Sequence, residues 1–255
     1  MNYINIPVEL CEYVIRNNFY RPMQLYIYLN THCSGKMKIS SNDLIEIGKA
    51  IGLKSARAVT NNLQKLLDKN WIGYSKKSKY YFIRSIDKIR QLHNFKKRKA
   101  AEFDSRHIKK LKAFLAAAKI GYLLNIQQWR KRATERKHGR SKHIARLSTD
   151  FYPLANTALA KLLKISVSTA FQLKQLARKA GYIKIRKTFV KLPLDSSHRD
   201  FYKKAMPEFA SLVKMKSDKL ILQDVDMVSH NLSFRNRKKL ETYIQGVSGG
   251  KRISS

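Results

Sequence analysis

Hydrophobic residues recur at helical spacing along most of the chain. In one stretch the i, i+4, i+7, i+8 spacing of Val59, Leu63, Leu66 and Leu67 predicts a helix with a single buried stripe. Ser55 stands where an N-cap is expected, and a second helix is predicted over 44–51, behind Ser41 as its cap. Two aromatic and β-branched runs then follow, at 71–75 and 80–84, and the lysine-rich turn between them predicts a β-hairpin.

The same order of elements recurs further along. Helices are predicted over 153–163 and 167–180, and Gly181 is placed to end the second one. Its inner stripe is expected to be Ala170, Leu173, Leu176 and Ala177. Strands over 182–186 and 188–192 are predicted to pair. The two groups lie about 111 residues apart, measured from Trp71 to Tyr182. Their sequences are not alike, but their elements follow in the same order, which indicates an internal repeat of architecture.

The remaining patterns are helical as well, and glycine (10) and proline (5) are scarce. A long helix is predicted over 105–137, and shorter ones over 201–213 and 219–228. The fold class predicted is therefore mainly α with short β-hairpins: two domains joined by a long basic helix. The expected boundaries are 1–90 for the first domain, 91–147 for the basic linker, 148–195 for the second domain core, 196–245 for a helical extension and 246–255 for a disordered tail.

The charge of the chain indicates what kind of partner the protein binds. Lysine and arginine number 53 and aspartate and glutamate 17, a net charge of +36 over 255 residues. So many positive charges on one chain repel each other, and binding to a polyanion relieves that repulsion. Nucleic acid is the first candidate for the polyanion and an anionic membrane surface is the second. Residues 88–146 alone hold 19 basic against 3 acidic residues.

The two repeated groups resemble winged helix-turn-helix DNA-binding domains. The resemblance is best over 157–183, where a helix rich in small residues, a Ser/Thr-rich start of the next helix and Gly181-Tyr182-Ile183 follow one another as in many bacterial regulators. The first group is a looser match, with Asn70-Trp71-Ile72 at the corresponding place. Tandem modules of this kind are similar in architecture to plasmid and phage replication initiators.

The resemblance implies that the second helix of each group contacts bases in the major groove and that the hairpin contacts phosphates. The basic end of the long helix is expected to contact phosphates too. The candidate DNA-binding residues are Ser55, Arg57, Asn61, Asn62, Lys65, Lys76, Lys77 and Lys79 in the first group, Arg130, Lys131 and Arg132 in the long helix, and Ser166, Ser168, Thr169, Gln172, Gln175, Lys184, Arg186 and Lys187 in the second group.

Signatures of catalysis are weak, and we expect no enzyme, no cofactor and no metal. His143 and Arg146 form only a fragment of the motif used by tyrosine recombinases, and the sequence contains neither an H-x-H pair nor a P-loop. Two cysteines, Cys11 and Cys33, form no disulfide framework, which favours a reducing compartment.

The expected function is sequence-specific binding of double-stranded DNA, in a replication initiator or a regulator of a plasmid, phage or other mobile element. Replication or transcription proteins and a second copy of the chain are possible partners, and we expect a cytoplasmic, nucleoid-associated protein that does not bind membranes. The alternative is an RNA-binding or ribonucleoprotein scaffold protein, in which the same positive charge follows a folded RNA.

Overall fold

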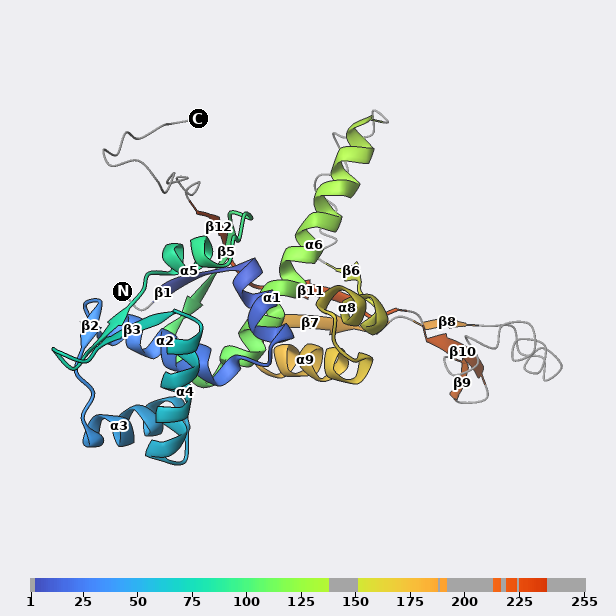
Figure 1. The fold of residues 1–255 in the computed structure, drawn as a ribbon. Helices are drawn as coiled ribbons and strands as arrows, with labels where there is room; N and C mark the ends of the chain where they lie inside the picture. The colour runs from blue at the N-terminus through green and yellow to red at the C-terminus, as the bar shows by residue number, and fades with distance from the viewer. Residues whose placement is uncertain are drawn as a thin grey trace. The chain divides into compact units, whose positions relative to one another are not determined.

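The computed structural model describes residues 3–137, 151–187, 189–191, 213–216, 219–223 and 225–237. The chain divides into two compact units (Figure 1): unit 1 comprises Met1–Lys119 and Leu232–Ser255, and unit 2 comprises Ile120–Asn231. Helices dominate, and the described strands form small antiparallel sheets of three strands each. The coarse prediction, mainly α with short strands, is confirmed.

Unit 1 begins with a strand and ends with one. Its elements are β1 (Tyr3–Pro7), α1 (Val8–Arg16), α2 (Tyr20–His32), β2 (Lys36–Met37), α3 (Ser41–Ile51), α4 (Ala56–Asp68), β3 (Ile72–Ser75), β4 (Tyr80–Ile83), α5 (Ile86–Leu92), β5 (Lys99–Asp104), the 3-10 helix η1 (Ser105–Lys110), the first part of α6 (Leu111–Lys137) and β12 (Phe234–Asn236). Its two sheets have the strand orders β1-β5-β12 and β2-β4-β3.

The core of unit 1 is built around Trp71, which is fully buried directly after α4. The rings of Tyr13, Phe19 and Tyr26 lie within 6.1, 5.2 and 5.5 Å of it, measured between centroids. The Trp71 indole Nε1 donates to His93 Nε2 over 2.9 Å, which requires that nitrogen to be unprotonated. Burial and the charge of Lys69 both lower the pKa of His93, which favours this neutral form.

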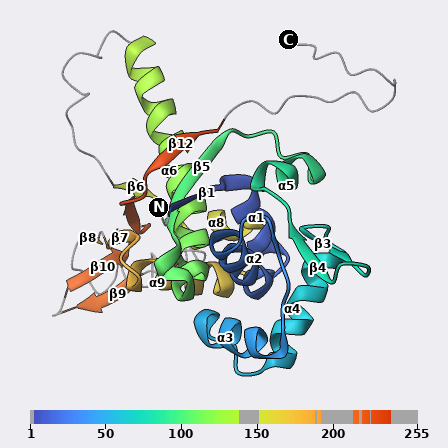
Figure 2. The same ribbon diagram turned by 90° about the vertical axis from the view of Figure 1, so that its left-hand side faces the viewer.

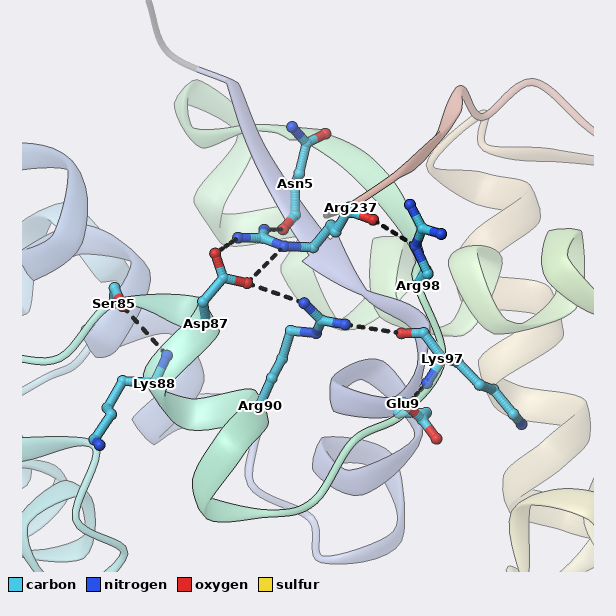
Figure 3. A network of polar contacts seen from close by, with 9 residues as sticks. All are labelled: Asn5, Glu9, Ser85, Asp87, Lys88, Arg90, Lys97, Arg98 and Arg237. Atoms are coloured by element: carbon cyan, nitrogen blue, oxygen red, sulfur yellow. Dashed lines mark hydrogen bonds and ion pairs between the residues drawn. The ribbon is translucent and has the colours of Figure 1, made fainter. Parts of the chain in front are cut away.

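Strand β12 returns the chain to unit 1, where Arg237 holds it (Figure 3). The Arg237 guanidinium donates to both carboxylate oxygens of Asp87, at 3.1 and 2.8 Å, and to the Asn5 carbonyl at 2.8 Å. Asp87 also accepts from Arg90, whose side chain is 1% exposed. Burial alone would raise the pKa of Asp87, but the hydrogen bonds and charges of Arg237 and Arg90 outweigh it and lower that pKa.

Unit 2 starts inside α6. It continues with β6 (Tyr152–Pro153), α8 (Asn156–Leu163), α9 (Val167–Lys179), β7 (Ile183–Arg186), β8 (Phe189–Lys191), β9 (Val213–Lys216), β10 (Lys219–Gln223) and β11 (Met227–His230). The strands form one sheet of order β6-β11-β7 and another of order β8-β10-β9. Leu159 and Leu163 of α8, Leu173 of α9 and Val228 of β11 are buried in this unit.

Several predictions about strands are wrong. Strand β7 pairs with β11, which lies more than forty residues later, and β8 pairs with β10, so 182–186 and 188–192 are not partners. Where a helix was predicted over 219–228, residues 219–223 form strand β10 and residues 227–228 begin strand β11. The predicted linker contains β5, which belongs to the first sheet of unit 1. The rest of the predicted 201–213 helix, apart from Val213 in β9, and the tail 246–255 lie outside the described residues.

The division into units also differs from the predicted domains. One boundary falls inside α6, and the chain passes back from unit 2 to unit 1 after Asn231. The long helix itself is confirmed over Leu111–Lys137. In unit 1 it is held by Lys119, which is 3% exposed and forms an ion pair with Glu12 of α1.

Candidate nucleic-acid interface

Helices α3 and α4 of unit 1 form a closely packed pair. Ser40, not Ser41, caps α3: its hydroxyl accepts from the Asp43 amide, and the Asp43 carboxylate accepts from the Ser40 amide. Gly52 ends α3 with φ +75°, a left-handed conformation that suits glycine. Gly48 lies where the helices approach, since a Cβ there would meet the Leu53 carbonyl and Val59 at 3.4 Å. Figures 1 and 2 show this pair with the hairpin β3–β4 following α4.

The outer face of α4 is polar and cationic. Ser55 caps the helix by accepting from the Ala58 amide at 3.2 Å, as predicted, and Val59, Leu63 and Leu66 are buried. Arg57, Asn61 and Lys65 are exposed. Asn62 does not lie on this outer face as predicted: it is 7% exposed and donates to the Ala58 carbonyl at 2.6 Å, so its amide is used inside unit 1.

The hairpin β3–β4 adds positive charge beside α4. Its strands pair from Ile72 opposite Ile83 to Ser75 opposite Tyr80, which confirms the predicted hairpin. Lys76, Lys77 and Lys79 are exposed in its turn. The three ammonium groups are therefore free of the core and available to an anion.

Helices α8 and α9 repeat the arrangement in unit 2. Lys164 ends α8 in the left-handed region with φ +53°, and the Ser166 hydroxyl accepts from the Thr169 amide at 3.1 Å to cap α9. The hydroxyls of Ser168 and Thr169 also bond to Ser166, at 3.0 and 2.8 Å. Gln172 is exposed and Gln175 is half-buried, so the predicted polar face of α9 exists, with its three hydroxyls partly engaged in the cap.

The inner stripe of α9 differs from the prediction at one position. Leu176 is 39% exposed, and Lys174 takes the buried place between Leu173 and Ala177. The Lys174 ammonium donates to the Leu154 carbonyl and to Asp226, each at 2.8 Å. Burial lowers the pKa of Lys174, and the Asp226 carboxylate opposes that shift. In the sequence, the position of Lys174 beside the apolar stripe of α9 is the signal for a buried lysine. Its partner Asp226 could not be identified in the same way, because it is 52 residues away.

The exposed face of α9 is also more apolar than that of α4. Val167 and Phe171, one helical turn apart, are 48% and 47% exposed. The two helix pairs therefore offer different chemistry: guanidinium, amide and ammonium groups on α4, and hydroxyl, amide and apolar groups on α9.

The other predicted cations are exposed as well. Lys184, Arg186 and Lys187 lie on or just after β7, where the Arg186 guanidinium stacks 4.5 Å from the Phe151 ring centroid. Arg130, Lys131 and Arg132 are exposed on α6, next to Trp129, which is 70% exposed. The end of α6 thus combines three cations with an uncovered indole.

Reactive groups are scarce in the part of the chain that the structure describes. No group of three or more His, Cys, Asp or Glu side chains there is placed to hold a metal ion. Cys11 and Cys33 form no disulfide with each other, and burial raises the pKa of the Cys11 thiol to about 12, so it stays protonated at neutral pH. None of the described helices has the length and apolar character needed to cross a membrane.

Comparisons with known proteins gave no match. No family model fits the chain, and neither the curated proteins nor the solved structures contain one significantly similar to it.

Proposed function

We propose that each unit contains a winged helix-turn-helix module and that the protein binds double-stranded DNA with sequence preference. The observation that carries this proposal is a repeated topology. In unit 1 a helix is followed by β2, α3, α4, β3 and β4, and the sheet order is β2-β4-β3. In unit 2, α6 is followed by β6, α8, α9, β7 and β11, and the sheet order is β6-β11-β7. In both, the first strand pairs with the third, which pairs with the second.

This order supports one functional arrangement in both units. The helix pair fixes the second helix, α4 or α9, so that its polar face is open to a major groove, while the paired strands beside it supply lysines to phosphates. On α4, Arg57 and Asn61 have the side chains that form bidentate contacts with guanine and adenine. The net charge of +36 favours the same polyanionic partner.

In unit 2 the hairpin is interrupted, because residues 187–226 separate β7 from β11. The pairing of β7 with β11 nevertheless preserves the sheet, and Asp226 at the return point forms the ion pair with Lys174 of α9. We call the hairpin that follows the second helix of each module its wing. The second module therefore has the same strand pairing as the first, with a long insertion at the tip of its wing.

Two modules on one chain suit a site with two half-sites, since binding of the first raises the effective concentration of the second. A replication initiator that binds repeated origin sequences and a regulator of a plasmid, phage or other mobile element both use such sites. We propose a role of this kind rather than catalysis.

The test is selection of bound sequences from a random duplex pool by the purified full-length chain. We expect a consensus with two half-sites. Direct repeats would favour an initiator, and a palindrome a dimeric regulator. Affinities for the selected duplex and for structured RNA, measured at the same salt concentration, complete the test. A preference for RNA, or the absence of any consensus, would overturn the proposal.

A further inference from the structure

The sheet β2-β4-β3 of unit 1 has one face that the function proposed above does not use. Strand β4 is central, and the register sets Phe82 directly between Lys36 on β2 and Gly73 on β3. Tyr80 lies two residues before Phe82 and therefore shares its face. The opposite face carries Tyr74 and Tyr81, whose ring centroids are 4.8 Å apart. We name the face of Phe82, Tyr80, Lys36 and Gly73 the outer sheet face.

Phe82 is uncovered although it stands on the central strand. Its side chain is 43% exposed. On one side its neighbour is a glycine, and a Cβ at position 73 would meet only the Phe82 Cβ, at 3.9 Å. Within the described part of the chain, no aromatic ring or cation lies against the Phe82 ring. An open aromatic face in this position is a surface on which a flat apolar group can stack.

Lysines lie on the β2 side of this ring, where Lys36 is the register partner of Phe82. The ammonium groups of Lys36 and Lys38 lie 5.7 and 5.1 Å from the centroid of the Tyr80 ring, which holds them at the border of the outer sheet face. Segments 33–40 and 71–85, which contain the three strands, have six lysines and arginines and no aspartate or glutamate. The ligand that fits is therefore an anion with flat apolar groups along its length.

We infer that the outer sheet face binds single-stranded DNA, with an unpaired base stacked on Phe82 and the neighbouring phosphates bound by Lys36 and Lys38. Stacking on an aromatic side chain combined with lysines along the backbone is how proteins hold single strands without sequence preference. A base in an intact duplex is already stacked on both sides and cannot reach the ring. The site is thus additional to the duplex contacts of α4, and it suits a strand opened beside a duplex site.

The charge pattern decides against an apolar protein partner, because a helix or strand docking here would leave the surrounding ammonium groups desolvated and unpaired. An acidic peptide would satisfy the lysines but gives no reason for the open ring. Among anionic polymers only a nucleic acid supplies both groups at every repeat.

The experiment compares two ligands that differ only in their bases. Fluorescence anisotropy gives the dissociation constants of full-length protein for an oligothymidylate and for an abasic strand of the same length. We expect the wild type to prefer the oligothymidylate, and Phe82→Ala to lose about 5- to 150-fold of that preference. Phe82→Tyr keeps a stacking ring and should retain it. The combined Lys36→Ala and Lys38→Ala variant should weaken both ligands alike.

Tyr74→Ala is the matched control, since Tyr74 is an equally exposed aromatic residue on the opposite face of the same sheet. It should leave the preference unchanged. The inference is overturned if the wild type binds both strands equally, if Tyr74→Ala acts like Phe82→Ala, or if single-stranded RNA is preferred at equal salt.

Binding of the selected duplex separates this inference from the proposed function. Phe82→Ala should bind that duplex as the wild type does. If the wild type binds the duplex but shows no base-dependent binding of single strands, only the inference is contradicted. If it binds single strands in a base-dependent way but selects no duplex, only the proposed function is contradicted.

Discussion

Arg57 and Asn62 lie on the same helix, but their side chains have different surroundings. Arg57 is exposed on the outer face of α4, whereas the Asn62 amide is buried and bonded to the Ala58 carbonyl. If α4 contacts bases, Arg57→Ala should reduce discrimination at one base pair by about 1–3 kcal/mol, because a bidentate contact is lost. Competition assays with single-base variants of the selected duplex measure this.

Asn62→Ala is the control from the same helix. It removes an internal hydrogen bond and should lower the free energy of unfolding by about 0.5–1.5 kcal/mol, without changing which bases are preferred. An unchanged base preference in Arg57→Ala would show that a different face of α4 meets the DNA.

Arg237 follows directly after the returning strand β12 and bonds to residues in the first half of unit 1. Arg237→Ala removes its bonds to Asp87 and Asn5 and should lower the free energy of unfolding by about 1–2 kcal/mol, a value reduced by water around the half-exposed Asp87. Urea denaturation followed by Trp71 fluorescence, in a Trp129→Phe background, measures the loss.

The neighbouring Arg235 provides the control, because its side chain is 62% exposed and its partner is Glu102. Arg235→Ala should cost less than about 1 kcal/mol. The two variants should also differ in acid. Since the pKa of Asp87 is lowered in the folded state, its pair contributes fully above the ordinary value of 3.8 and loses that contribution as the pH falls through the lowered pKa. Arg237→Ala should flatten this part of the pH profile.

At the scale of elements, we expect the segment between β7 and β11 to be separable from the α8–α9 pair and its sheet. Residues 188–225 hold seven lysines and arginines against five acidic residues, so they are nearly neutral in a strongly basic chain. Replacing them by Asn-Gly would connect Lys187 to Asp226 through a two-residue turn that suits the antiparallel pairing of β7 with β11.

We expect this deletion variant to melt no lower than the wild type, because a short connection costs less closure entropy than a long one. Its affinity for the selected duplex should stay within about threefold, since few net charges are removed. Thermal denaturation and anisotropy check both. A large loss of affinity in a folded variant would place the insertion in the DNA interface.

The elements that the sequence predicts well are those specified locally. The Ser55 cap and the hairpin around 76–79 depend on neighbours within a few residues, and both are present. Asn62 was expected to be exposed and Leu176 to be buried, and the structure shows the reverse. A buried stripe assigned from spacing can be wrong at its edges, because each residue rotates by about 100° around the helix axis.

Pairing between distant strands was beyond such local signals. Residues 188–192 look as suitable as a partner for β7 as β11 does, and they are closer in sequence. The choice is made by Val228 of β11, which is fully buried opposite Ile185 in a strand that also pairs with β6. The short apolar run 220–222 suits a helix as well as a strand until its partners are known. Phe82 was missed because its exposure depends on Gly73 across the register.

At the scale of the whole molecule, positive charge is present in both units. Unit 1 exposes the lysines of the β3–β4 turn, and unit 2 exposes those after β7 and the cations of α6. The chain also passes twice between the units, once within α6 and once after Asn231. A DNA site contacted by both modules should therefore involve more phosphates than either module could contact alone.

The salt dependence of binding measures that number. If six to ten phosphates are contacted, affinity for the selected duplex should fall by roughly 10³- to 10⁵-fold between 50 and 200 mM salt. Lys76→Ala combined with Lys77→Ala should weaken all duplexes alike and reduce the slope of log affinity against log salt by about 2, one for each lost phosphate contact. Gln172→Ala removes no charge and should leave the slope unchanged. A flat response in the wild type would mean that the 53 basic residues do not meet the phosphate backbone.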